Sequence, residues 1–222
     1  YTLGRIPELV WLSAEEFEKN SRTLKKLDSF DGVVVPGGFG ERGVSGKIKV
    51  IECARKKKIP YLGLCYGMQL AVVEYARHVA KLKRAHTTEV DAGTPHPVID
   101  ILPDQKKNIA EEKYGGTMRL GGYVALLKKG TIARRAYGRE TVEERHRHRY
   151  EVNPAYVERL TKAGLIFSGT SPDMKLMEIM ELSQKIHPFF MGTQFHPEFQ
   201  ARPLVPHPLF NEFISACIRK KN

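Results

Sequence analysis

The residues with the clearest capacity for covalent chemistry are a cysteine and the two glycines around it. Gly63-Leu64-Cys65-Tyr66-Gly67 follows a short apolar run and precedes a stretch with helical periodicity. Small residues on each side permit the sharp strand-to-helix turn that displays a nucleophile. At a helix N-terminus, the dipole and the unpaired N–H groups favour thiolate over thiol. An inert buried cysteine is the alternative, and the glycines and the strand-helix order favour the nucleophile.

The other two cysteines lack this context. Cys53 and Cys217 lie within helical patterns, where a free cysteine behaves as a small apolar residue. The three cysteines are odd in number and far apart, and none has the spacing of a metal ligand set. We therefore expect no metal site and a reducing, intracellular setting.

A histidine and a glutamate follow the most apolar run of the chain. In Phe195-His196-Pro197-Glu198-Phe199, the proline disfavours a helix, and residues two apart in extended backbone point the same way. A carboxylate that accepts from one imidazole nitrogen leaves the other free to take a thiol proton. The pattern by itself is weak and can be a surface coincidence, but its place after a strand and late in the chain favours a base.

The other histidines carry no comparable signal. His146 and His148 lie in an arginine-rich run. The remaining five have no carboxylate at a useful spacing, and we expect them to be structural or solvated: His78, His86, His96, His187 and His207.

A glycine-rich loop at Pro36-Gly37-Gly38-Phe39-Gly40 follows another apolar run. Consecutive glycines let backbone N–H groups approach a ligand oxygen, which suits an oxyanion or a phosphate. The segment has neither the Gly-Lys-Ser/Thr ending of a Walker A loop nor the GxGxxG pattern, so an oxyanion hole is the stronger interpretation. An ordinary glycine turn remains the alternative.

Short apolar runs and amphipathic stretches alternate along the chain and must position these groups. Apolar runs predict strands at 9–12, 32–35, 59–64, 165–169, 177–181 and 189–195. Spacings of three and four predict helices at 14–27, 47–57, 68–79, 155–163 and 208–218. The stretch 91–122, rich in proline and glycine, is expected to form surface loops and short strands.

This alternation predicts an α/β fold, with a three-layer, open, mainly parallel sheet and helices on both faces. In such sheets reactive groups gather at the carboxyl ends of the strands, which is where the three segments lie. A chain of 222 residues with 41% hydrophobic content can bury the core of one large domain, so we expect a single domain over 1–222.

Composition excludes several function classes. The net charge is +11, but the basic residues are dispersed and lack the aromatic interleaving or helix spacing of nucleic-acid readers, so nucleic-acid binding is not the expected role. The first ten residues resemble neither a signal peptide nor a membrane span, which predicts a soluble protein with no membrane partner.

Together, and in this order, the three segments resemble the class I, or triad, glutamine amidotransferases. Their domains carry Pro-Gly-Gly, then Gly-x-Cys-x-Gly, then His-Pro-Glu near the end. Gly-Leu-Cys-Tyr-Gly-Met-Gln at 63–69 and Gln-Phe-His-Pro-Glu-Phe at 194–199 are each specific. Within that class the chain resembles the CTP synthases, through segments at 36–40, 69–74, 115–121 and 144–153.

The resemblance implies an activity and partners. The domain would hydrolyse L-glutamine to glutamate and ammonia without a cofactor or metal of its own. A synthetase domain, N-terminal on the same parent chain and absent from this sequence, would use the ammonia with ATP and magnesium to convert UTP to CTP. GTP would activate allosterically, and the full-length enzyme would be a cytoplasmic homo-oligomer, a tetramer.

The resemblance also assigns residues. Cys65, His196 and Glu198 correspond to the catalytic triad, and the N–H groups of Gly38 and Tyr66 to the oxyanion hole. The glutamine site would add the three residues Gln69, Glu89 and Arg149. Arg119 is a candidate for the allosteric GTP site.

Two departures from the family pattern stand out, and rival functions remain open. The family usually has leucine where this chain has Tyr66, and the region before Pro36 is short by about one strand and one helix, which were removed or are disordered. The rivals are the glutaminase of another amidotransferase, such as GMP synthase or carbamoyl-phosphate synthetase, a catalytically silent basic binding module, and a cysteine peptidase.

Overall fold

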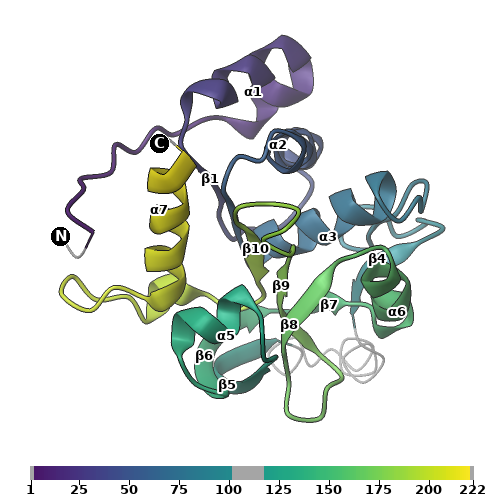
Figure 1. Ribbon diagram of the computed structural model, residues 1–222. Coiled ribbons are helices and arrows are strands. Elements are labelled where there is room, and N and C mark those ends of the chain that lie inside the picture. Colours follow the sequence, from purple (N-terminus) through teal and green to yellow (C-terminus); the bar gives the residue numbers. More distant parts are fainter. Residues whose placement is uncertain (1–2, 102–117, 221–222) are drawn as a thin grey trace.

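The computed structural model describes residues 3–101 and 118–220, and its helices follow the amphipathic stretches of the sequence (Figure 1). Six α-helices have these bounds: α1 Ala14–Lys19, α2 Val44–Lys56, α3 Tyr66–His78, α5 Ile132–Tyr137, α6 Pro154–Lys162 and α7 Pro208–Lys220. Two 3₁₀ helices complete the set within these ranges: η1 Ser21–Ser29 and η3 Pro197–Phe199.

The main sheet has seven strands in the order β1-β2-β10-β9-β8-β5-β6 among the described residues. Their bounds are β1 Val33–Val35, β2 Tyr61–Leu64, β10 Phe190–Thr193, β9 Met177–Glu181, β8 Ile166–Thr170, β5 Arg119–Leu127 and β6 Thr141–His148. A smaller sheet, in the order β3-β4-β7, consists of β3 His86–Thr87, β4 Pro97–Ile101 and β7 Tyr150–Val152.

The two faces of the main sheet contact two separate apolar clusters. Neighbouring residues of one strand alternate between them: Tyr61 belongs to the cluster beneath α2 and α3, and Leu62 to the one beneath α5 and α7. Phe190 and Met191 alternate in the same way. Because successive strand residues point to opposite faces, this alternation means that helices cover both faces. In Figure 1, α7 and α3 lie on opposite sides of β10. The predicted α/β fold with helices on both faces is confirmed.

The strand directions differ across the sheet. β1, β2 and β10 are mutually parallel, whereas β9, β8, β5 and β6 pair antiparallel to their neighbours. Parallel character is therefore confined to the three strands that precede the chemical motifs, and the sheet as a whole is mixed. Short connections explain the change, because β8 and β9 are consecutive in the chain and a short link can join only antiparallel neighbours.

The N-terminal expectations were only partly correct. Residues 9–12 form no strand: the side chains of Leu9, Val10 and Trp11 are exposed, with Trp11 at 87%, and only Leu12 packs against the core. The predicted helix at 14–27 divides at Asn20, whose side chain accepts the N–H of Arg22 and starts a separate 3₁₀ helix. Half of the stretch 91–122 lies outside the described residues, namely 102–117, which includes 115–117 of the segment 115–121. No described helix is long and apolar enough to cross a membrane.

Candidate active site

The three motifs leave the main sheet at neighbouring points of one edge. Val35 is aligned with Gly63, and Leu64 with Thr193, so β1, β2 and β10 end side by side. The glycine-rich loop follows β1, Cys65 follows β2, and His196 lies three residues beyond the end of β10. Because these strands are parallel, all three segments emerge at their carboxyl ends, as expected.

Cys65 occupies a strained turn between β2 and α3. Its φ of 49° and ψ of −99° lie in a region that non-glycine residues rarely adopt. The flanking glycines make the turn possible: a Cβ on Gly67 would lie 2.2 Å from the carbonyl oxygen of Val35, and one on Gly63 would lie 2.7 Å from the carbonyl carbon of Gly67. The close approach of α3 to β1 and β2 thus requires glycine at both positions.

The sulfur of Cys65 is enclosed, which keeps the resting group a neutral thiol. Burial raises the pKa of Cys65 to about 12, whereas the main-chain N–H of Tyr66, which hydrogen-bonds to the sulfur, lowers it. The side-chain amide of Gln194 approaches the sulfur at 3.8 Å. A thiol in this environment needs a base to become nucleophilic.

His196 has the hydrogen bonding of an oriented base. Its Nδ1 lies 2.6 Å from Oε1 of Glu198, so Nδ1–H donates to the carboxylate and Nε2 is left as the acceptor nitrogen. Nε2 is buried and has no hydrogen-bond partner among the described residues. The ring stacks on Phe199 with centroids 4.7 Å apart, and the main-chain N–H donates to Arg145. These contacts fix the imidazole.

The glycine-rich loop touches both groups. A Cβ on Gly37 would lie 2.9 Å from Cε1 of His196 and 3.7 Å from Cβ of Cys65, so the two side chains flank one glycine. A Cβ on the next residue, Gly38, would lie 3.7 Å from Cδ1 of Tyr66. The structure therefore brings together the thiol, the imidazole and the loop that was interpreted as an oxyanion hole.

Comparison with known proteins identifies the family of this arrangement. The model of the class I glutamine amidotransferases matches residues 2–216. The solved glutaminase domain of Trypanosoma brucei CTP synthase, with bound acivicin, superimposes with a TM-score of 0.90 and 36% identity, covering 98% of this chain and 83% of that one. The chain belongs to the glutaminase domains of the CTP synthases.

Sequence relatives agree with this membership. The CTP synthase of Rubrobacter xylanophilus is 56% identical over 95% of this chain, and that of Methanococcus aeolicus is 52% identical over 95%. The chain covers only 37% and 39% of these two proteins, respectively. It therefore spans less than two fifths of the length of the CTP synthases that it matches.

Of the residues assigned to glutamine by the family resemblance, Gln69 is linked to the thiol through Gln194. Gln69 is buried, and its amide donates to the carbonyl of Tyr150 at 2.9 Å and to Gln194, the residue that approaches the sulfur. Beyond the dominant effect of burial, the charge of Glu89 raises the pKa of Tyr150 and that of Arg149 lowers it. Glu89 and Arg149 therefore both lie near Tyr150, and their roles in binding glutamine stay a prediction.

Arg119, the candidate for the GTP site, is engaged in a buried cluster. Its guanidinium lies 3.1 Å from Oε1 of Glu151 and 2.9 Å from Oε1 of Glu178, and only 8% of the residue is exposed. This geometry favours a structural role for Arg119. A direct contact with a nucleotide stays a prediction.

Two histidines that the sequence placed in a basic run complete this cluster. His148 Nδ1 lies 3.1 Å from the carbonyl of Tyr150, which can only accept, and His148 Nε2 lies 2.9 Å from His146 Nδ1. Both rings are therefore neutral donors through Nδ1. Burial lowers the pKa of His146 to about 3 and raises that of Glu151 to about 8. His146 also contacts the ring of Phe195, next to the candidate base.

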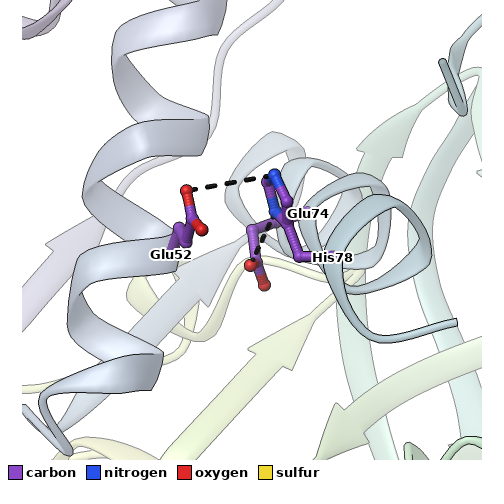
Figure 2. A group of neighbouring side chains, drawn as sticks. All are labelled: Glu52, Glu74 and His78. Atoms are coloured by element: carbon purple, nitrogen blue, oxygen red, sulfur yellow. Dashed lines mark hydrogen bonds and ion pairs between the residues drawn. The ribbon is translucent and has the colours of Figure 1, made fainter. Parts of the chain in front are cut away.

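One group has the geometry of a metal site, and its contacts indicate another role. Glu52, Glu74 and His78 converge between α2 and α3 (Figure 2). Both oxygens of Glu74, however, accept from the Arg55 guanidinium at 2.7 and 2.8 Å, while His78 Nδ1 lies 3.0 Å from the same carboxylate. The guanidinium already neutralises the buried charge, so this group acts as an ion pair between two helices.

Proposed function

We propose that this domain hydrolyses L-glutamine through a Cys65-His196-Glu198 triad and a thioester intermediate. His196 Nε2 takes the Sγ proton, and the sulfur attacks the side-chain amide carbon of glutamine. The resulting oxyanion accepts hydrogen bonds from the N–H groups of Gly38 and Tyr66. The observation that carries the proposal is the enclosed thiol beside an imidazole whose Nδ1 is bonded to Glu198 and whose Nε2 is left to accept a proton.

The remaining steps return the groups to their starting state. The carbon–nitrogen bond breaks as His196 gives its proton to the departing nitrogen, which leaves as ammonia. Water then attacks the thioester, His196 removes a proton from it, and the carbon–sulfur bond breaks to release glutamate. Glu198 stabilises the imidazolium that forms in each step. The sulfur regains its proton from His196.

Recognition of the α-amino and α-carboxylate groups is assigned to opposite charges. We place the ammonium of glutamine at Glu89 and the carboxylate at Arg149, with Gln69 supporting the wall of the site through Gln194. In the longer parent protein, a synthetase domain would consume the ammonia in the ATP- and magnesium-dependent amination of UTP to CTP, with GTP as activator. The similarity to longer CTP synthases supports this part.

Removal of the thiol tests the mechanism directly. Cys65→Ala should abolish glutamine hydrolysis, because the nucleophile is removed. The unfolding midpoint should change little, because only one buried atom is lost and the cavity it leaves is small. Glutamate release is the measurement, and alkylation by an electrophilic glutamine analogue, located by mass spectrometry, is the independent readout. Cys217→Ala is the matched control, since that cysteine is also buried and lies outside the site.

Each rival predicts a different result. Appreciable glutamine turnover by Cys65→Ala would refute the mechanism. A silent binding module would leave Cys65 unlabelled in the parent chain. A cysteine peptidase would cleave peptides without dependence on glutamine, and the glutaminase of another amidotransferase would differ only in the product made by the intact parent protein.

A further inference from the structure

The side chain of Tyr66 packs against the glycine-rich loop at residues 36–40. Its hydroxyl donates to the carbonyl of Gly40 at 2.6 Å, and its ring packs 3.7 Å from the Cβ position of Gly38. The ring is 1% exposed, and Nζ of Lys47 lies 5.2 Å from the ring centroid. Tyr66 therefore contacts the loop at two points, Gly38 and Gly40.

Gly40 links Tyr66 to Glu89, the residue assigned to the α-amino group of glutamine. Its N–H donates to Oε1 of Glu89 at 2.8 Å, and its φ of 76° is a conformation that favours glycine. A single residue thus accepts from Tyr66 through its carbonyl and donates to Glu89 through its N–H. The two hydrogen bonds fix both peptide planes that adjoin Gly40.

We propose that the Tyr66 hydroxyl, acting through Gly40, positions the Glu89 carboxylate to bind the α-amino group of the substrate. The inference rests on the proposed glutaminase function and makes Tyr66 a positioning residue through its side chain. Oε1 of Glu89 is occupied by Gly40, so Oε2 is the oxygen directed to the ammonium.

Removal of the Tyr66 hydroxyl should weaken the hold of Gly40 on Glu89. Without its donor, the partly buried carbonyl of Gly40 loses a hydrogen bond, and the loop gains orientations in which its N–H no longer holds Glu89. Binding of the substrate ammonium must then also order the Glu89 carboxylate, which costs binding free energy. Affinity for ligands with the amino group should fall, whereas ligands without it should bind as before.

Two alkylating reagents test this proposal. The first is a glutamine analogue with a chloroketone in place of the amide, and the second is the same molecule without the α-amino group. Each alkylates Cys65 as the sulfur–carbon bond forms and chloride leaves. In Tyr66→Phe, the inhibition constant of the first reagent should rise roughly five- to tenfold, the value for one lost hydrogen bond. The inhibition constant of the second reagent should rise by no more than about twofold, because that reagent has no α-amino group to contact Glu89.

A matched control and a double variant complete the test. Tyr75→Phe removes a similar hydroxyl, which donates to the carbonyl of Ala163 at 2.7 Å from the same helix, and should change neither reagent's constants. In a Glu89→Gln background, Tyr66→Phe should have no further effect, because the two act in series.

The outcomes separate the two proposals. Failure of both reagents to alkylate the unsubstituted protein would overturn the glutaminase function itself. If the unsubstituted protein is alkylated but Tyr66→Phe leaves the inhibition constant of the first reagent unchanged, only the positioning role is overturned. Equal weakening of both reagents would also overturn it, because a general loosening of the site does not depend on the amino group.

Discussion

In the proposed mechanism, Glu198 would determine which nitrogen of His196 serves as the base. A carboxylate accepts only, so Nδ1 must carry the proton and Nε2 must lack one in the neutral ring. Pro197 lies between them and begins the 3₁₀ turn η3, which holds the pair at 2.6 Å. The carboxylate is partly open to solvent, with 39% of its side chain exposed, so its effect on the imidazolium is orienting as well as electrostatic.

Replacement of this carboxylate by an amide should impair turnover without impairing binding. In Glu198→Gln, the amide carries no charge to stabilise the imidazolium and can present its NH₂ to Nδ1, which favours the wrong tautomer. We expect kcat for glutamine hydrolysis to fall roughly a hundredfold with little change in KM. Steady-state kinetics measures this split. Glu212→Gln, which alters an ion pair with Arg135 outside the site, is the control. An unchanged kcat would remove Glu198 from the mechanism.

At the scale of elements, the decisive contact is between the first turn of α3 and the end of β1. Gly67 lies in that turn, and the Val35 carbonyl fills the position that a Cβ would take. The hydroxyl of Tyr61, from β2, donates to the carbonyl of Gly67 at 2.9 Å. This packing holds Cys65 in its strained conformation and sets the helix N-terminus against the glycine-rich loop.

Addition of one methyl group at this contact should therefore displace the whole helix start. Gly67→Ala places a Cβ 2.2 Å from a backbone oxygen, which can be relieved only by a backbone shift, at a cost of about 1–3 kcal/mol. Urea unfolding measures the loss, and hydrolysis should fall with it because Cys65 moves. Gly93→Ala is the control, since its nearest neighbour, Oδ1 of Asp91, is 3.7 Å away and accommodates a methyl. Equal stability of the two variants would contradict this packing.

The same elements show how far the sequence could predict the structure. The strand ends beside Cys65 and His196 were predictable because glycine and proline interrupt strongly apolar runs there. β6 was missed because its buried face is polar: Glu144, His146 and His148 occupy inward positions that apolar residues usually take. Residues 9–12 have the apolar pattern of a strand, but no neighbouring strand pairs with them.

Long-range contacts account for the rest of the difference. The bond between Gly40 and Glu89 joins residues 49 apart, and that between Gln69 and Gln194 joins residues 125 apart. Neither residue pattern contains a local signal for such a partner. The family resemblance placed Glu89 and Gln69 near the substrate, and only the packed structure gives their hydrogen-bond partners.

For the molecule as a whole, the free energy of unfolding depends on buried groups whose pKa values are shifted in opposite directions. Burial lowers the pKa values of His86, His146, His148 and His187, so the unfolded chain binds protons below about pH 6.5 that the folded protein does not. This contribution to stability falls as the pH decreases. Burial raises the pKa of Glu151 to about 8, and its contribution is instead lost as the pH rises through that value.

A single variant, His146→Gln, measures how much one buried histidine contributes to the loss of stability at acidic pH. His146 faces His148 at 2.9 Å and Glu178 at 3.8 Å, and the positive charge of Arg119 adds to burial in lowering the pKa of His146 to about 3. His146→Gln keeps an amide donor for His148 and removes the titration. The wild-type advantage in unfolding free energy should therefore shrink by about 1.4 kcal/mol per pH unit between pH 6.5 and about 3.

Urea unfolding of both proteins at pH 7.5, 6.5 and 5.5 measures this difference, and each pH provides its own control because all other groups are shared. The advantage should decrease by only about 0.3 kcal/mol between pH 7.5 and 6.5, because at most half of the unfolded molecules carry a proton on this ring, and by about 1 kcal/mol between pH 6.5 and 5.5. The NMR signal of the His146 ring should also show no titration above pH 5 in the folded protein. A constant advantage down to pH 5.5 would mean that this ring is protonated in the folded protein, and the neutral hydrogen-bond chain from His146 through His148 to Tyr150 would then be wrong.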